Sequence, residues 1–147
     1  MTQRLDYESI ASDGMKALGG VYGYVHKSGL PADLVNLVYL RVSQINGCAY
    51  CIELHSHDLL KAGVPTRKLL LVSAWREAGL FDAREQAALG WAEALTLLPQ
   101  TGAPDADYAV AGVVFSPKEL ADLSIAIGLM NVYNRIAVGF RRGPDAG

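Results

Sequence analysis

Charge is the scarcest property of this 147-residue chain, because only 19% of its residues are Asp, Glu, Lys or Arg, where soluble domains carry about a quarter. The 13 Lys and Arg residues nearly balance the 15 Asp and Glu residues, which leaves a formal net charge of −2. This balance provides no basic surface for a polyanion, so we expect no nucleic-acid partner. Hydrophobic residues make up 51% of the chain, which is enough for a sizeable core at this length.

The sequence also lacks a long uninterrupted apolar segment. Its most apolar stretch, residues 123–140, contains Asn131, Asn134 and Arg135, whereas a membrane-spanning helix needs about 20 nearly uncharged apolar residues. Residues 1–8 contain neither a basic n-region nor an apolar h-region, so export is not expected. We therefore predict a cytoplasmic protein with no membrane partner.

Cysteine is nearly absent as well, with only two residues in the chain. Two cysteines in a cytoplasmic chain of this size do not form a disulfide framework and are more typical of catalysis or metal binding. No low-complexity segment and no repeat of about 20–50 residues divides the chain. We predict a single domain over residues 1–147.

What the sequence does contain is helical periodicity interrupted by short loops. Asp82 with Glu85, and Ser116 with Glu119, fit capping boxes that mark helix starts. The predicted helices cover residues 7–26 (with a break near Gly19), 31–44, 48–62, 65–75, 82–99, 105–115 and 116–140. The valine-rich stretch 110–115 would also suit a strand, but no alternating strand and no hairpin signal is found. We predict an all-α domain of about six to seven helices.

The last predicted helix carries apolar residues around almost its whole circumference. A helix of this kind has to be covered on all sides. Either it is the central core helix of the domain, or it is shared with a neighbouring subunit, which the scarcity of charge favours. We therefore predict a homo-oligomer built around residues 116–140.

Reactive side chains gather in one segment, residues 46–55. The pair Asn46-Gly47 is a turn signal, so Cys48 falls at the start of a new helix. At about 100° per residue, one inward-facing stripe contains Cys48, Cys51, Ile52, His55, Leu59 and Ala62. A different, solvated face of the same helix carries Glu53, His57 and Lys61.

This stripe suits thiol chemistry. Unfilled backbone amides at a helix N-terminus stabilise a thiolate, and His55, four residues after Cys51, can exchange a proton at neutral pH. Residues three apart on a helix have α-carbons about 5–5.5 Å apart, within the range of a disulfide. Cys51 can therefore attack an oxidant, form a sulfenic acid and be resolved by Cys48, although the helix start does not by itself choose between the two cysteines. Asp58 either orients the imidazole or is a solvated carboxylate.

Three other interpretations compete. The cysteines can be small buried hydrophobic residues, but a histidine seven residues after Cys48, directly behind a turn, argues against this. A structural zinc normally needs four ligands, and only His57 and His26 remain, with His57 on another face. A thioredoxin-type motif needs an adjoining βαβ pattern, which is missing. We expect no metal and no other cofactor.

Residues 40–56 are similar to the core motif of the alkylhydroperoxidase D-like proteins, in the carboxymuconolactone decarboxylase superfamily. Further similarity lies in residues 62–65, 73–77, 81–96 and 130–138, so the resemblance covers roughly residues 30–140. It implies an all-α fold that assembles as a trimer or hexamer. It also implies a peroxidase that reduces organic hydroperoxides or hydrogen peroxide and is re-reduced by a dithiol reductant or a reductase protein. In the family pattern Cys51 is the peroxidatic cysteine, Cys48 the resolving cysteine and His55 the proton-relay histidine.

One departure from the family pattern bears on activity. The relay of the family usually includes a glutamate twelve residues before the first cysteine, and that position here is Asn36, which cannot titrate. The residue between the cysteines is Tyr50, where the family often has histidine. The relay is then either shorter or rerouted through Glu53 or Asp58. Two alternatives to a peroxidase follow: a non-catalytic thiol redox sensor or exchange module, and a carboxymuconolactone decarboxylase-type lyase.

Overall fold

The computed structural model describes residues 1–144, and these form helices without any strand. The helices are α1 (Tyr7–Ile10), α2 (Ser12–His26), α3 (Ala32–Asn46), α4 (Ala49–Lys61), α5 (Thr66–Leu70), the 3-10 helix η1 (Val72–Ala74), α6 (Trp75–Ala78), α7 (Ala83–Thr96), α8 (Leu98–Thr101), α9 (Asp105–Val114) and α10 (Pro117–Gly139). The all-α prediction is confirmed. The helices outnumber the six to seven expected because four of them, α1, α5, α6 and α8, are only one turn or slightly longer.

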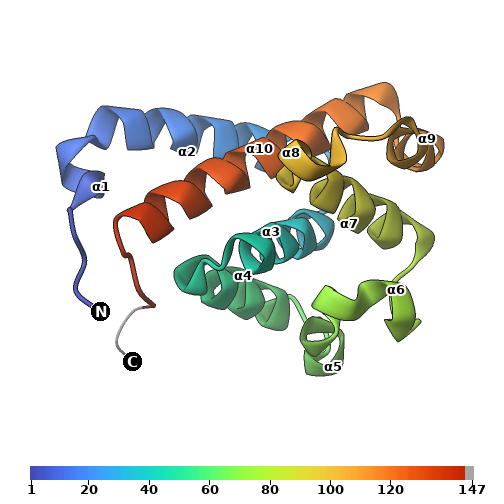
Figure 1. Ribbon diagram of the computed structural model, residues 1–147, viewed down its shortest axis with the longest axis horizontal. Helices are drawn as coiled ribbons and strands as arrows, with labels where there is room; N and C mark the ends of the chain where they lie inside the picture. The colour runs from blue at the N-terminus through green and yellow to red at the C-terminus, as the bar shows by residue number, and fades with distance from the viewer. Residues whose placement is uncertain (145–147) are drawn as a thin grey trace.

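Helix α3 is the centre of the fold. Its buried side chains include consecutive residues and so cover every side of the helix: Leu34, Val35, Leu37, Val38, Tyr39, Leu40, Val42 and Ser43. It packs against α4, α7 and α10. Figure 1 shows α2 lying along α10 at one edge of the molecule, with α5 and α6 at the opposite edge. The beginning of the chain meets the end of α10, where the backbone N–H of Arg4 donates to the carbonyl of Phe140 over 2.9 Å.

The first predicted helix is interrupted at a different place from the one expected. The helix continues through Gly19 and Gly20, and the break lies at Ala11, between α1 and α2. Two glycines inside a helix cost about 1 kcal/mol each relative to alanine, but α2 packs against α10, where Val25 is buried and the Tyr24 hydroxyl donates to Asp122. Packing therefore outweighs the weak helix propensity of this pair.

Residues 65–75, predicted as one helix, form α5, η1 and the start of α6 instead. Leu69, Val72 and Trp75 are all buried, and they recur at every third position. A 3-10 turn aligns side chains three residues apart, whereas an α-helix rotates them progressively out of line. The tighter pitch keeps these three side chains in one apolar cluster with Leu37 and Leu59.

The segment after α7 also differs from expectation. The predicted capping box is present, since the backbone N–H of Glu85 donates to the Asp82 carboxylate over 2.9 Å. The helix ends at Thr96, however, and Pro99 lies in the first turn of α8 rather than closing α7. Proline is tolerated there because the N–H it lacks has no helical partner in a first turn.

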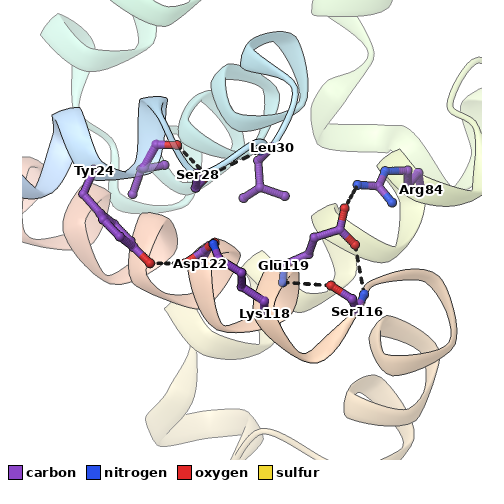
Figure 2. Close-up of polar contacts among 9 residues, drawn as sticks. Tyr24, Ser28, Leu30, Arg84, Ser116, Lys118, Glu119 and Asp122 are labelled. Carbon is purple, nitrogen blue, oxygen red and sulfur yellow. Dashed lines mark hydrogen bonds and ion pairs between the residues drawn. The ribbon is translucent and has the colours of Figure 1, made fainter.

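Polar contacts fix the first turns of α10 (Figure 2). In the predicted capping box, the N–H of Glu119 donates to Ser116 Oγ over 3.2 Å and the N–H of Ser116 donates back to the carboxylate over 2.9 Å. Arg84 of α7 binds the same carboxylate over 2.7 Å, and the Tyr24 hydroxyl of α2 donates to Asp122 over 2.6 Å. These contacts tie α10 to both α2 and α7.

Helix α10 covers nearly the predicted span, but it is not the central helix. One side packs against α2, α3 and α7, while Ile125 and Val132 on the other side are 42% and 40% exposed. Within residues 1–144 no helix has both the length and the apolarity to cross a membrane. The apolar circumference of α10 is thus only partly covered by this chain.

Candidate active site

The site is built on the turn that joins α3 to α4. Gly47 has a φ of +69°, in the left-handed region that glycine adopts without steric cost. The chain reverses direction there, and the N–H of Cys48 donates to the carbonyl of Ser43 over 3.0 Å. Cys48 becomes the N-cap of α4, and its sulfur accepts the backbone N–H of Cys51 over 3.3 Å. A sulfur in this position is stabilised as a thiolate.

Cys48 and Cys51 are joined in a disulfide, with α-carbons 5.3 Å apart. Their exposed fractions are only 1% and 4%, so neither sulfur lies on the open surface. The spacing expected for residues three apart at a helix start is confirmed. The structure therefore represents the oxidised state of a dithiol pair.

His55 lies one turn beyond Cys51 and is 3% exposed. Its Nδ1 is 3.1 Å from Oδ1 of Asn36 on α3, and its ring packs against Tyr39 with ring centroids 5.0 Å apart. Burial lowers the pKa of His55 to about 4, although the negative charge of Asp58 acts in the opposite direction. The imidazole is therefore neutral at pH 7. With the amide oxygen of Asn36 facing it, Nδ1 carries the proton and Nε2 keeps a free lone pair.

The predicted site residues separate into two groups. Cys48, Cys51, His55 and Asn36 are brought together on the facing sides of α3 and α4. Asp58 is partly buried and reaches His55 only through its charge. In contrast, Glu53 is exposed. The inward stripe is otherwise as predicted, except that Ala62 at its end is exposed.

A cavity of about 270 Å³ opens beside Cys51 and His55 and does not border Cys48. Tyr50 and Leu54 of α4 contribute to the same wall as these two residues. The cavity therefore distinguishes the two cysteines, which the helix start alone does not.

The remaining walls of this cavity come from distant parts of the chain. Helices α1 and α2 contribute Tyr7, Glu8, Met15, Gly19 and Tyr22, and α10 contributes Met130, Tyr133 and Ala137. None of these residues was predicted as part of the site, because their place depends on long-range packing of α1, α2 and α10 around α4. The one sequence signal available was the similarity of residues 130–138 to the family pattern.

Asparagine side chains of α10 hold the turn before Cys48. Nδ2 of Asn46 donates to Oδ1 of both Asn131 and Asn134 over 3.0 Å. Asn134 is fully buried, and its own Nδ2 donates to Ser43 Oγ over 3.0 Å. Asn131 donates in turn to Thr96 Oγ1 over 3.1 Å. We call Asn46, Asn131 and Asn134 the asparagine clamp.

Breaking the asparagine clamp is expected to destabilise the protein. In Asn134→Ala, Asn46 loses one of its two acceptors and Ser43 loses a donor, and an unsatisfied buried group costs about 1–3 kcal/mol. With the small cavity left behind, we expect the free energy of unfolding, measured by urea titration, to fall by about 2–4 kcal/mol. The exposed Lys61 of α4 provides the control, since Lys61→Ala should stay within about 0.5 kcal/mol of wild type. An equal change in the free energy of unfolding for the two variants would contradict a stabilising role of the asparagine clamp.

The buried neutral state of His55 predicts a pH-dependent stability. Its pKa in the folded protein is about 4, below the value of about 6.5 in an unfolded chain. Between these two values the unfolded chain therefore binds a proton that the folded protein does not. The stability that His55 contributes by staying neutral is complete above pH 6.5 and is lost as the pH falls towards 4. Between pH 7.5 and 4.5, we expect the oxidised wild type to lose ~3 kcal/mol more unfolding free energy than His55→Gln.

Urea titrations at a series of pH values measure this difference. His57 lies on the same helix and is exposed, so His57→Gln is the matched control and should keep the pH slope of the wild type. A His55→Gln protein with the slope of the wild type would show that His55 is not buried in its neutral form.

Comparison with known proteins gives these features a family context. The model of the carboxymuconolactone decarboxylase family matches residues 13–94. The protein YdfG of Bacillus subtilis (strain 168) is 34% identical over 138 residues, which are 94% of each chain. YnjA of Escherichia coli (strain K12) is 32% identical over 115 residues, which are 77% of this chain and 63% of YnjA.

Solved structures agree with this relationship. ATU0492 of Agrobacterium tumefaciens, a protein of unknown function provisionally assigned to antioxidant defence as AhpD, is 36% identical, with a TM-score of 0.96 over 99% of this chain and 100% of its own. The debrominase Bmp8 is 19% identical, with a TM-score of 0.84 over 94% of this chain and 74% of its own, and it shares the fold. The predicted family is confirmed: this chain belongs to the carboxymuconolactone decarboxylase family and has the AhpD-like fold.

Proposed function

We propose that this protein is a cysteine-dependent peroxidase that reduces hydroperoxides through a dithiol/disulfide cycle of Cys51 and Cys48. One observation carries the proposal. The cavity borders Cys51 and His55 but not Cys48, and Cys48 is the residue that is bonded to Cys51. A substrate in the cavity meets a single sulfur, with the neutral imidazole beside it and the second sulfur behind it.

The first half of the cycle starts from the reduced pair. Nε2 of His55, which is unprotonated at pH 7, accepts the proton of the Cys51 thiol only transiently, because an imidazolium with a pKa of about 4 gives the proton up readily. The thiolate attacks the terminal oxygen of the hydroperoxide, the O–O bond breaks, and the leaving alkoxide takes the proton from the imidazolium. The products are an alcohol and a sulfenic acid on Cys51.

The second half forms the disulfide that the structure contains. Cys48 attacks the sulfenic sulfur of Cys51, the S–S bond forms, and water leaves with the proton of the Cys48 thiol. In total, one hydroperoxide and two thiols give one alcohol, one water and one disulfide. The contact between Cys48 sulfur and the N–H of Cys51 favours the Cys48 thiolate that this step requires.

An external dithiol returns the pair to the reduced state by supplying two electrons and two protons. Its thiolate attacks the more accessible sulfur, that of Cys51, and Cys48 leaves as a thiolate stabilised by the helix N-terminus. The partners of this chain are therefore a hydroperoxide and a dithiol reductant or reductase protein.

Single-turnover experiments with the pre-reduced protein test the assignment of the two cysteines. Without added reductant, wild type should consume one equivalent of hydroperoxide and form the disulfide. Cys48→Ser should also consume one equivalent but stop at a sulfenic acid that dimedone traps, and Cys51→Ser should consume none. Retained peroxide consumption in Cys51→Ser would overturn the proposal.

Steady-state rates separate an enzyme from a redox sensor. With excess dithiol, a peroxidase consumes many equivalents of hydroperoxide per chain at a rate comparable to its single turnover. A sensor would form the disulfide once and then show no sustained consumption. Disulfide formation without sustained consumption would replace the proposal of a peroxidase with that of a redox sensor or exchange module.

We further propose that the protein is a homo-oligomer, a trimer or hexamer, whose interface includes the outer side of α10. Exposed apolar side chains at Ile125 and Val132, seven residues apart on one face of α10, support it, because such side chains are typical of buried contacts between chains. Sedimentation of the wild type should show a trimer or larger species. Val132→Glu should shift the protein towards the monomer, and a wild type that sediments as a monomer would refute the assembly.

A further inference from the structure

The disulfide is placed differently for a small reductant and for a protein reductant. Cys51 is only 4% exposed, and the cavity of about 270 Å³ is its opening to the outside. A small dithiol has to bring only its own sulfur into this cavity. A protein dithiol has to form a mixed disulfide with Cys51, in which the α-carbons of the two cysteines lie about 4.4–6.8 Å apart. The backbone of such a partner reaches Cys51 only if one wall of the cavity moves aside.

The walls of the cavity differ in how firmly they are held. Helices α4 and α10 pack against the central helix α3, and α2 packs against α10. Helix α1 is a single turn of four residues, and Tyr7 is its one buried residue. A helix this short has little stability of its own, and a chain end stays ordered only where contacts fasten it. The wall that α1 provides is therefore the one that can move without disturbing the core.

We call residues 4–10 the strap, because both ends of this segment are fastened to the end of α10. The backbone N–H of Arg4 donates to the carbonyl of Phe140 over 2.9 Å. The Arg4 guanidinium donates to the carbonyl of Gly139 over 3.1 Å. The ring of Tyr7 stacks on that of Phe140, with ring centroids 5.7 Å apart. These contacts hold the strap in place from outside the cavity.

A further contact of the strap lies beside the cysteines. The Glu8 carboxylate pairs with Arg142 over 2.8 Å, and the guanidinium of Arg142 lies 4.6 Å from the centre of the Tyr50 ring. Tyr7, Glu8 and Tyr50 all line the cavity together with Cys51, the residue that follows Tyr50. The Glu8 side chain is 51% exposed, so water and salt weaken this ion pair. The strap thus covers the cavity near Cys51 through contacts that break and re-form at small cost.

We propose that the strap is a gate for the reductant of the disulfide. With the strap in place a small dithiol reaches Cys51, whereas a protein dithiol reduces the disulfide only after the contacts between the strap and residues 139–142 have broken. This inference deepens the proposed function, because it concerns the reduction of the same disulfide.

The gated reaction is a thiol–disulfide exchange in two steps. The thiolate of the reductant forms a bond to the Cys51 sulfur, the bond between the two cysteines breaks, and Cys48 leaves as a thiolate. The second thiol of the reductant then displaces Cys51, so that the reductant becomes a disulfide and its two protons pass to the two cysteines. Only the first step requires the strap to be released when the reductant is a protein.

The test measures the reduction of the oxidised full-length protein in the absence of any peroxide. The reductant is either dithiothreitol or thioredoxin that is kept reduced by NADPH and its reductase, and the freed cysteines are alkylated and counted by mass spectrometry. Glu8→Gln and Arg4→Gln each weaken one contact of the strap. Each should raise the rate with thioredoxin about two- to fivefold, the range that exposed ion pairs and hydrogen bonds support. The double variant should gain about tenfold, and all rates with dithiothreitol should stay within twofold of wild type.

Two controls separate release of the strap from a change in charge. The double variant has the net charge of the wild type, since one substitution removes a negative charge and the other a positive one. Asp13→Asn makes the same charge change as Glu8→Gln at an exposed position of α2, and it should leave the rate with thioredoxin within twofold of wild type.

Hydrogen exchange measures the release of the strap directly. The backbone N–H of Ile10 donates to the carbonyl of Asp6 over 3.1 Å, and that of Ala11 donates to the carbonyl of Tyr7 over 3.0 Å. Exchange of these two amides should accelerate in each variant by the same factor as reduction by thioredoxin, because both require the strap to open.

The outcomes separate this inference from the proposed function. Rates with thioredoxin that are equal in wild type and double variant, or a faster reduction without faster exchange at Ile10 and Ala11, would overturn the gate. A double variant that thioredoxin does not reduce would overturn it as well. If the expected rates are found in a protein that consumes no hydroperoxide, the gate stands and the peroxidase proposal fails.

Discussion

The asparagine clamp on the α3–α4 turn is the contact on which the site depends. The two sulfurs are placed by a single left-handed glycine and by the helix that begins after it. A turn of this kind has little stability by itself, and its side-chain contacts come from α10, 85 and 88 residues further along the chain. Each amide group of the clamp satisfies another in the interior, so the loss of one leaves buried partners unpaired. The geometry of the dithiol is therefore a property of the assembled fold and not of the motif.

The site also shows how burial and a neutral hydrogen-bond partner keep an imidazole uncharged. His55 is enclosed by Tyr39 and held by the neutral amide of Asn36, and burial lowers its pKa to about 4. A carboxylate at position 36 would favour the imidazolium through its charge. The amide keeps the hydrogen bond, and with it the orientation and tautomer of the ring, but it adds no charge. The departure of Asn36 from the family pattern thus leaves the imidazole neutral at pH 7, but without the negative charge that would raise its basicity.

Local patterns were predictable from the sequence, and packing between distant segments was not. The stripe from Cys48 to Leu59 and both capping boxes follow from residues within one or two turns of each other, and all are present. The 3-10 turn at Val72 arises because three side chains have to reach the same cluster, which only the assembled core defines. The break at Ala11 and the walls of the cavity likewise depend on how α1 and α2 lie against α10. The asparagine clamp could be seen in sequence only as polar interruptions of an apolar helix.

The cavity brings together helices that are far apart in the sequence, since α1, α2 and α10 line it together with α4. Its walls include residues 7–22 and 130–137, and α1 is fastened by the stacking of Tyr7 on Phe140. During synthesis, α3 and α4 leave the ribosome long before α10 exists, so the cysteines are made before the chamber that separates them from solvent. Newly made chains therefore pass through an interval in which the thiol pair has neither the cavity beside it nor the asparagine clamp. The cavity is therefore complete only after α10 has been translated.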